Sequence, residues 1–200
     1  MYLDTKGLVT IGIGNLIDPV SLARPLPLQF KAMNKANAPA GRLATHAEIE
    51  KEWAFIKNHP KRQQFIDKGH LLCAAETDLE LSELNRLQLF DAKTADNERQ
   101  LRGYFTEFDQ WPADAQLALM AMAWGLGAGF PSKWPKFKAA CIKKDFDAAA
   151  AESKVSSWPA RRNDPSKRMF TNAARVLANP DFYSVTTLYH PRVLLDAITV

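Results

Sequence analysis

The sequence predicts an α+β fold, with a small β-hairpin lobe over residues 1–44 and a larger, mainly helical lobe over residues 45–200. Two patterns lead to this prediction. Residues 1–16 read as short strands joined by a tight turn, and several segments after residue 44 carry apolar residues at helical spacing behind capping residues. A chain of 200 residues suits one domain or two small lobes with a shared core. We therefore expect the two lobes to form one domain together.

The hairpin carries an acid and a hydroxyl group close to its turn. If residues 5–7 form the turn, Asp4 lies opposite Leu8, and Tyr2 lies opposite Thr10. Asp4 and Thr10 then share one face as diagonal neighbours, roughly 7 Å apart or less. A carboxylate and a hydroxyl group at that distance can hold one water molecule between them, as a hydrolase requires. Each residue also has an ordinary explanation, because Asp favours positions before turns and Thr favours strands.

The middle of the chain is predicted to contain an irregular connection and then helices. Residues 17–44, rich in Pro, Ala and Asn, read as a loop. Thr45 to Glu48 has the form of a capping box, and the helix that it starts should end before Pro60. Residues 77–81 alternate like a short strand, and Ser82 can cap a long helix that reaches about Tyr104. The middle of that helix is almost entirely polar, and a break is expected there.

The last third of the chain is predicted to be helical. Residues 113–124 are rich in Ala and Met and apolar on almost every side, which indicates a buried core helix. A short helix follows at 134–143, Asp145 caps the next one, and Asp164-Pro165 is expected to start a last helix to about Ala178. The tail from Pro180 reads as irregular or weakly extended.

Composition excludes several classes of function. No apolar run approaches the ~18 residues of a membrane span, and the N-terminus lacks the pattern of a signal peptide. The net charge of +4 favours polyanionic partners, but no basic cluster is interleaved with aromatic residues, so nucleic acid is not expected as a partner. Cys73 and Cys141 read as buried free thiols, and no Cys/His spacing fits a metal site.

The N-terminal stretch resembles the active-site hairpin of the phage-type lysozymes (muramidases), a family that includes pesticin-like bacteriocins and secreted antibacterial effectors. Its pattern is a Glu at the end of a first helix, then an Asp, then Thr-Ile-Gly-x-Gly-His. Asp4 and Thr10 match the Asp and the Thr, and Asn15 stands where the family often has His. Further matching pieces lie in the second half: Trp124-Gly-Leu-Gly, Phe137, Asp145-Phe146, Trp158, Arg162-Asn163, Arg168 and Phe170.

The resemblance implies a lysozyme-like fold and hydrolysis of the bond between N-acetylmuramic acid and N-acetylglucosamine in peptidoglycan. Asp4 and Thr10 would be the catalytic residues. It implies no cofactor, a monomer, and the glycan strands of peptidoglycan as partner, with an immunity protein or secretion machinery as further partners. Made in the cytoplasm without a signal peptide, the protein would act in the periplasm or on the cell wall after delivery by a holin or a secretion system. The residues expected to contact substrate are Asn15, Trp158, Arg162, Asn163 and Arg168.

The family's catalytic Glu lies about nine residues before the Asp, which places it upstream of Met1. Three explanations are open: the helix that bears the Glu precedes this sequence, the tail over residues 180–200 covers the surface that this helix would cover, or the chain is a remnant. We favour the first. Glu48, Glu76 and Glu152 are substitutes by residue type alone, and no spacing selects one of them.

Two other functions remain open. The chain can be a catalytically silent module, derived from a lysozyme, that binds peptidoglycan or another partner. It can also be an unrelated helical protein with a chance hairpin. Lysis of purified sacculi would distinguish an enzyme from the catalytically silent module.

Overall fold

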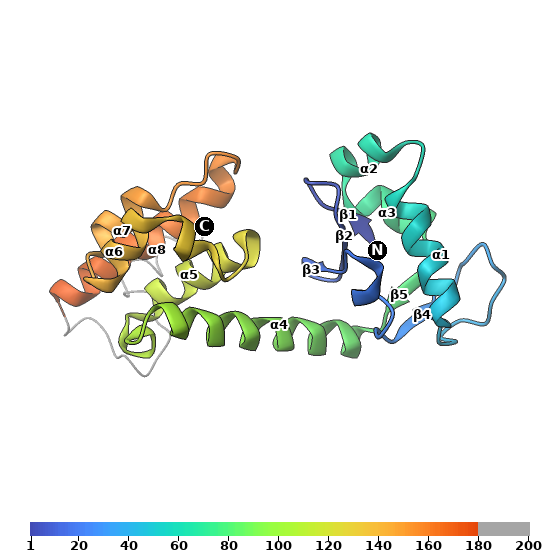
Figure 1. Cartoon of the computed structure of the whole chain (residues 1–200), viewed down its shortest axis with the longest axis horizontal. Helices are drawn as coiled ribbons and strands as arrows, with labels where there is room; N and C mark the ends of the chain where they lie inside the picture. The colour runs from blue at the N-terminus through green and yellow to red at the C-terminus, as the bar shows by residue number, and fades with distance from the viewer. Residues whose placement is uncertain (180–200) are drawn as a thin grey trace, which may run out of the picture. The chain divides into compact units, whose positions relative to one another are not determined.

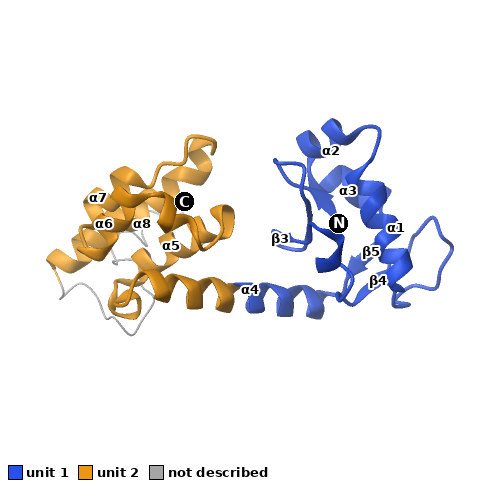
Figure 2. Ribbon diagram, in the orientation of Figure 1, with its two compact units in different colours: residues 1–93 blue, residues 94–200 orange. Residues whose placement is uncertain are grey.

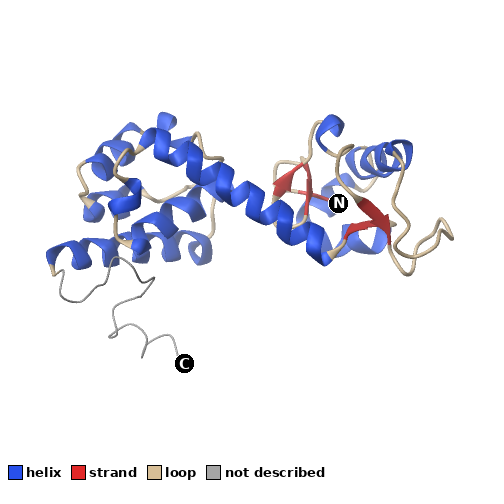
Figure 3. Cartoon of the chain, turned by 90° about the horizontal axis from the view of Figure 1, so that it is seen from below, coloured by secondary structure: helices blue, strands red, loops and turns tan. Residues whose placement is uncertain are grey.

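The computed structural model describes residues 1–179 and has an α+β fold, as predicted. The chain forms two compact units, Met1–Lys93 (unit 1) and Thr94–Val200 (unit 2), which are coloured separately in Figure 2. All strands of the described chain belong to unit 1 (Figure 3). Unit 1 also includes residues 45–93, which the sequence analysis assigned to the helical lobe, because three helices of this stretch pack on the first strands.

Unit 1 contains two small antiparallel sheets. The first has the order β1 (Tyr2–Leu3), β2 (Val9–Ile11) and β3 (Asn15–Leu16). The second pairs β4 (Leu28–Phe30) with β5 (Leu79–Leu81). The predicted strand at 77–81 is therefore confirmed. The expected loop over residues 17–44 is interrupted by β4 and by a short 3-10 helix, η1 (Val20–Leu22).

Three helices complete the core of unit 1: α1 (His46–Lys57), α2 (Arg62–Lys68) and α3 (His70–Glu76) (Figure 1). The predicted capping box is confirmed, because the Thr45 side chain accepts from the Glu48 amide and the Glu48 carboxylate accepts from the Thr45 amide. Apolar side chains from these helices and the first sheet meet in one cluster, which includes Leu3, Val9, Ile11, Ile49, Ile56 and Phe65.

Helix α4 (Glu83–Tyr104) begins in unit 1 and ends in unit 2. Its start is capped as predicted, since the Asn85 amide donates to the Ser82 hydroxyl oxygen at 3.2 Å. The expected break in the polar middle is wrong, because the helix is continuous. Side chains one turn apart are bonded there, for example the Gln100 amide to Asp96 at 2.8 Å, which supports a helix with few buried residues.

Unit 2 is helical in its described part. After η2 (Phe108–Gln110) it contains α5 (Ala113–Leu126), η3 (Phe130–Lys133), α6 (Pro135–Ile142), α7 (Phe146–Glu152) and α8 (Ala160–Ala178). Aromatic side chains dominate its core, with Trp111, Phe137, Phe146 and Phe170 buried in one cluster. The predicted core helix and the predicted cap at Asp145 are confirmed: α5 packs closely on α8, and the Asp145 carboxylate accepts from the Ala148 amide at 3.0 Å.

The predicted start of the last helix at Asp164-Pro165 is wrong. Helix α8 begins at Ala160, after an extended Pro159, and Pro165 lies inside it. A proline there removes only the one amide that would bond to the Arg161 carbonyl, so the helix tolerates it near its first turns. The expected irregular tail from Pro180 lies outside the described residues. Within residues 1–179, no helix is both long and apolar enough to cross a membrane.

Candidate functional site

The hairpin places Asp4 at the entrance of its turn. Tyr2 pairs with Thr10 and Leu3 with Val9, which is the predicted register. The Asp4 carboxylate closes the turn, because its Oδ1 accepts from the amides of Lys6 and Leu8, both at 2.8 Å. Both bonds use one oxygen, so the turn leaves Oδ2 outside this arrangement. The two bonds therefore fix the direction of the carboxylate.

Thr10 lies on the same face of the hairpin as Asp4, because side chains alternate along a strand and Thr10 pairs with Tyr2, two residues before Asp4. Its hydroxyl group donates to the Leu8 carbonyl at 3.3 Å, which orients the oxygen beside the turn. Thr10 is 4% exposed and Asp4 is half-buried. The acid is thus the more accessible member of the pair.

Asn15 lies on the opposite face of the same sheet. It pairs with Ile11, whereas Thr10 pairs with Leu16, so Asn15 does not join Asp4 and Thr10. Asn15 is 5% exposed, and its Nδ2 has no hydrogen-bond partner in the described part of the chain. A buried donor without an acceptor is uncommon in folded proteins. In the sequence analysis this residue was expected to contact substrate, and the orphaned amide is its most notable property here.

Basic side chains from the helices hold the turn in place. The Gly7 carbonyl accepts from Arg62 Nη2 at 2.9 Å and from Lys57 Nζ at 3.3 Å. Gly7 has φ +70°, a conformation that strains other residues, and a Cβ atom there would lie 2.0 Å from Arg62 Nη2 and displace this guanidinium group. Lys57 also pairs with Asp18, whose carboxylate accepts from the Val9 amide at 3.1 Å.

Asp18, Lys57 and Val9 form a clamp on the hairpin, and the pKa of Asp18 reflects these contacts. Burial by itself would raise the pKa of Asp18, but the hydrogen bonds from Lys57 and Val9, together with the positive charges of Lys57 and Arg62, hold it below its usual value. The carboxylate therefore stays charged and ties β2 to α1. The position of the hairpin thus depends on this ion pair as well as on its own strands.

In unit 2, Asn163 organises the loop before α8. Its Oδ1 accepts from the Val155 amide at 2.8 Å, and its Nδ2 donates to the carbonyls of Val155 at 3.0 Å and Trp158 at 2.9 Å. The side-chain amide of Asn163 is therefore hydrogen-bonded to the backbone of the protein itself. The side chain that was expected to contact substrate therefore positions the loop that carries Trp158.

Trp158 and Arg162 form a stacked pair. The Arg162 guanidinium carbon lies 3.9 Å from the centre of the Trp158 ring, and burial lowers the pKa of Arg162. The pair packs against Gly125 of α5, where a Cβ atom would lie 2.4 Å from Trp158 Cζ2 and 2.1 Å from Arg162 Nη2. The structure thus brings Trp158, Arg162 and Asn163 together. An aromatic ring backed by a guanidinium group is a surface on which a sugar ring can stack.

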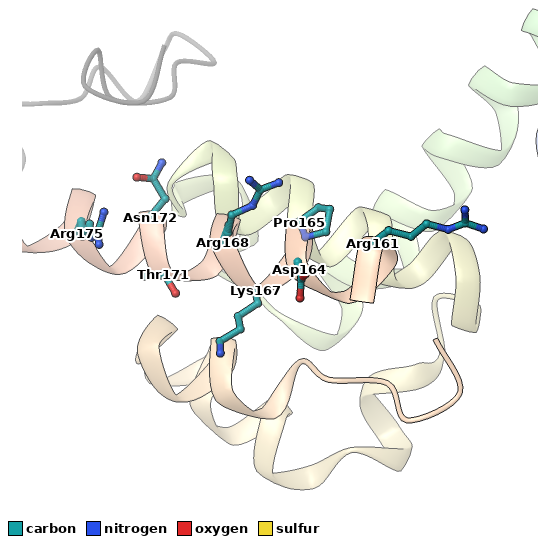
Figure 4. A pocket seen from close by; sticks show the side chains of 8 residues that line it. All are labelled: Arg161, Asp164, Pro165, Lys167, Arg168, Thr171, Asn172 and Arg175. Carbon is teal, nitrogen blue, oxygen red and sulfur yellow. The ribbon is translucent and has the colours of Figure 1, made fainter. Parts of the chain in front are cut away.

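Arg168 lies farther along α8, beside a pocket of about 660 Å³ (Figure 4). All lining residues from the described chain belong to this helix. Four of them are basic, Arg161, Lys167, Arg168 and Arg175, and all four are exposed. Asn172 also lines the pocket; its Nδ2 donates to the buried Asp114 of α5, and its Oδ1 has no partner among residues 1–179. Of these basic residues the sequence analysis named Arg168 alone, although the arginines recur at intervals of seven residues.

Each of the three acids considered as substitutes for the family's Glu has another environment. Glu48 belongs to the capping box and pairs with Arg42, and the hydrogen bond from Arg42 lowers the pKa of Glu48 to about 2. A hydrogen bond from Lys35 lowers the pKa of Glu76. Glu152 is exposed. The two lowered pKa values do not suit a general acid at neutral pH.

Sequence reasoning also missed Glu52. This residue is 9% exposed and borders a pocket of about 300 Å³ in unit 1. Its Oε2 accepts from the amides of Asp78 at 2.6 Å and Leu79 at 2.9 Å, and burial raises its pKa. Its Oε1 has no hydrogen-bond partner among the residues that the structure describes. The signal was present in the sequence, because Glu52 falls on the apolar face of α1 between Ile49 and Ile56.

The described residues contain no group of three or more His, Cys, Asp or Glu side chains placed to hold a metal ion. Two sets of predicted residues remain, each within its own unit: Asp4, Thr10 and Asn15 in unit 1, and Trp158, Arg162, Asn163 and Arg168 in unit 2. Comparison with models of protein families, with curated protein sequences and with solved structures finds no match to this chain.

Proposed function

We propose that the chain is a peptidoglycan-degrading, lysozyme-like glycoside hydrolase, specifically an N-acetylmuramidase. The observation that carries the proposal is the register of the hairpin. Pairing of Tyr2 with Thr10 puts Asp4 and Thr10 on one face beside a tight turn, in the sequence pattern that resembles the lysozyme hairpin. The order of a β-containing unit, a long helix and a helical unit agrees with the same proposal.

The chemistry divides between carboxyl groups on the two sides of the scissile bond. One carboxylic acid protonates the leaving oxygen, and a second carboxylate stabilises the oxocarbenium-like transition state or activates water. Asp4 would take the second role, because its Oδ1 is held by the turn and its Oδ2 is left for water or substrate. The Thr10 hydroxyl would hold that water from the neighbouring strand. In the resemblance, the acid is the Glu that precedes Asp4 in the pattern.

The test measures reducing ends released from purified sacculi by this chain and by the product of the full-length gene. A muramidase leaves N-acetylmuramic acid at the new reducing ends. We expect Asp4→Asn to lower the rate by about 100-fold or more while keeping an oxygen that accepts from the turn amides. Asp67→Asn, at an exposed acid of α2, is the matched control and should keep full activity. Absence of new reducing ends with either protein would remove the proposal.

A second candidate is a catalytically silent peptidoglycan-binding module. The observation that favours it is the structural use of the pair, since Asp4 already accepts two turn amides and Thr10 is almost completely buried. A module of this kind would sediment with sacculi and release no muropeptides. Wild-type protein and Asp4→Asn would then behave identically in both measurements.

A further inference from the structure

The excess positive charge of the chain is concentrated in α8. This helix holds five of the 26 basic residues and one of the 22 acidic residues, so the remaining 21 basic and 21 acidic residues balance. The net charge of +4 is therefore the net charge of one helix. Such a concentration creates a local positive potential that the overall composition does not reveal.

Three of these residues form a regular row. Arg161, Arg168 and Arg175 follow one another at intervals of seven residues, which is two helical turns or about 10.5 Å along the axis. Residues at this spacing lie on one side of a helix. Figure 4 shows the three arginines distributed from the first turn of α8 to its last, along the pocket that Lys167 also lines. We call Arg161, Arg168 and Arg175 the basic row.

The basic row forms no ion pair with another residue of the described chain, whereas Arg24, Arg86 and Arg99 elsewhere each pair with an acid. Exposed guanidinium groups that form no ion pair are available to bind anions, and Arg matches a carboxylate with two parallel hydrogen bonds. The charge complement of this surface is therefore an anion outside the described chain.

From this arrangement we infer that the basic row of unit 2 binds the peptide carboxylates of peptidoglycan strands. That the polymer is peptidoglycan rests on the proposed function. That the bound groups are carboxylates rests on the spacing and charge of the basic row. A disaccharide repeat carries at most one stem peptide, so carboxylates are spaced out along the strand, as the arginines are. Asp164, exposed between Arg161 and Arg168, offers a partner for an amine of the same peptides.

The same features disfavour nucleic acid and other densely charged polyanions. Single-stranded nucleic acids stack their bases on aromatic side chains, and no aromatic residue of the described chain lines this pocket. A continuous row of phosphates would also bring negative charge against Asp164. A polymer that carries separated carboxylates together with amines avoids both difficulties.

The experiment measures equilibrium binding of the full chain to sacculi from which other wall polymers have been stripped. All proteins carry Asp4→Asn, so binding is read without cleavage. The test variant is Arg161→Gln/Arg168→Gln/Arg175→Gln. The control, Arg24→Gln/Arg86→Gln/Arg99→Gln, removes the same charge at three exposed, ion-paired arginines. A second arm uses sacculi whose peptide carboxyl groups have been amidated.

We expect the test variant to bind native sacculi about 10- to 100-fold more weakly than the control triple variant, with a smaller dependence on salt. Amidated sacculi should bind the parent protein as weakly as native sacculi bind the test variant. Equal loss in both triple variants, unchanged binding to amidated sacculi, or stronger binding to DNA or anionic vesicles than to sacculi would each overturn the inference. Arginine-dependent binding in this experiment, combined with no release of reducing ends in the separate cleavage test of the proposed function, would uphold the inference while removing the proposed hydrolase.

Discussion

Replacement of Asn163 by alanine tests whether this residue holds the loop before α8. The change removes three hydrogen bonds, one accepted from the Val155 amide and two donated to the carbonyls of Val155 and Trp158. A typical hydrogen bond contributes about 0.5–1.5 kcal/mol net, and a buried group left without its partner costs more than an exposed one. Because Val155 is buried, we expect unit 2 to lose roughly 3 kcal/mol of unfolding free energy.

Two measurements examine this expectation. Urea unfolding followed by circular dichroism gives the free energy, and hydrogen exchange of the Val155 amide reports directly on the bond to Asn163. Asn179→Ala is the control, since Asn179 is exposed and donates one bond at 3.4 Å. If Asn163→Ala changes stability by less than ~0.5 kcal/mol, or leaves exchange at Val155 unaltered, the structural role is refuted.

Three further variants probe the clamp, the stacked pair and the buried acid. Asp18→Asn should destabilise unit 1 at neutral pH, because a carboxylate whose pKa is lower in the folded than in the unfolded state stabilises the fold while it is charged. In acid titrations of unfolding, the difference in stability between wild type and variant should shrink as the pH falls below about 4. Gly125→Ala should destabilise unit 2 by about 1–3 kcal/mol through its clash with Trp158, and it should shift the tryptophan emission. The control Gly103→Ala, in open space on α4, should stabilise the protein. A stabilising effect of Gly125→Ala would contradict the packing. Glu52→Gln should raise the melting temperature at pH 7, since burial raises the pKa of Glu52 and the buried charge destabilises the fold. This gain should vanish on acidification, when Glu52 of the wild type takes up a proton. A gain that persists in acid would refute this explanation.

Local signals were read correctly from the sequence. The capping box at Thr45, the cap at Asp145 and the register of the first hairpin depend on residues within a few positions of one another, and all three are present. The α+β class follows from the same signals. The catalytic role of Asp4 and Thr10 stays a prediction. The strand register places both side chains on one face of the hairpin, but it does not determine which reaction they support.

Errors arose where contacts outside the capping and strand patterns decide the structure. Helix α8 begins before Pro165 because Asn163 ties its entry to Val155 and Trp158, which no propensity encodes. The continuity of α4 depends on pairs such as Asp96 with Gln100, whose sum outweighs the polar composition. The partners of Glu52, at residues 78 and 79, are 26 and 27 positions away.

Each compact unit contains one buried cysteine, Cys73 in unit 1 and Cys141 in unit 2. Burial raises the pKa of both thiols, that of Cys141 to about 12, so neither should react with an alkylating reagent until its surroundings open. Mass spectrometry after timed alkylation can therefore assign a rate of local unfolding to each half of the same molecule. The chain carries a separate internal reporter for each half, with no need for an introduced label.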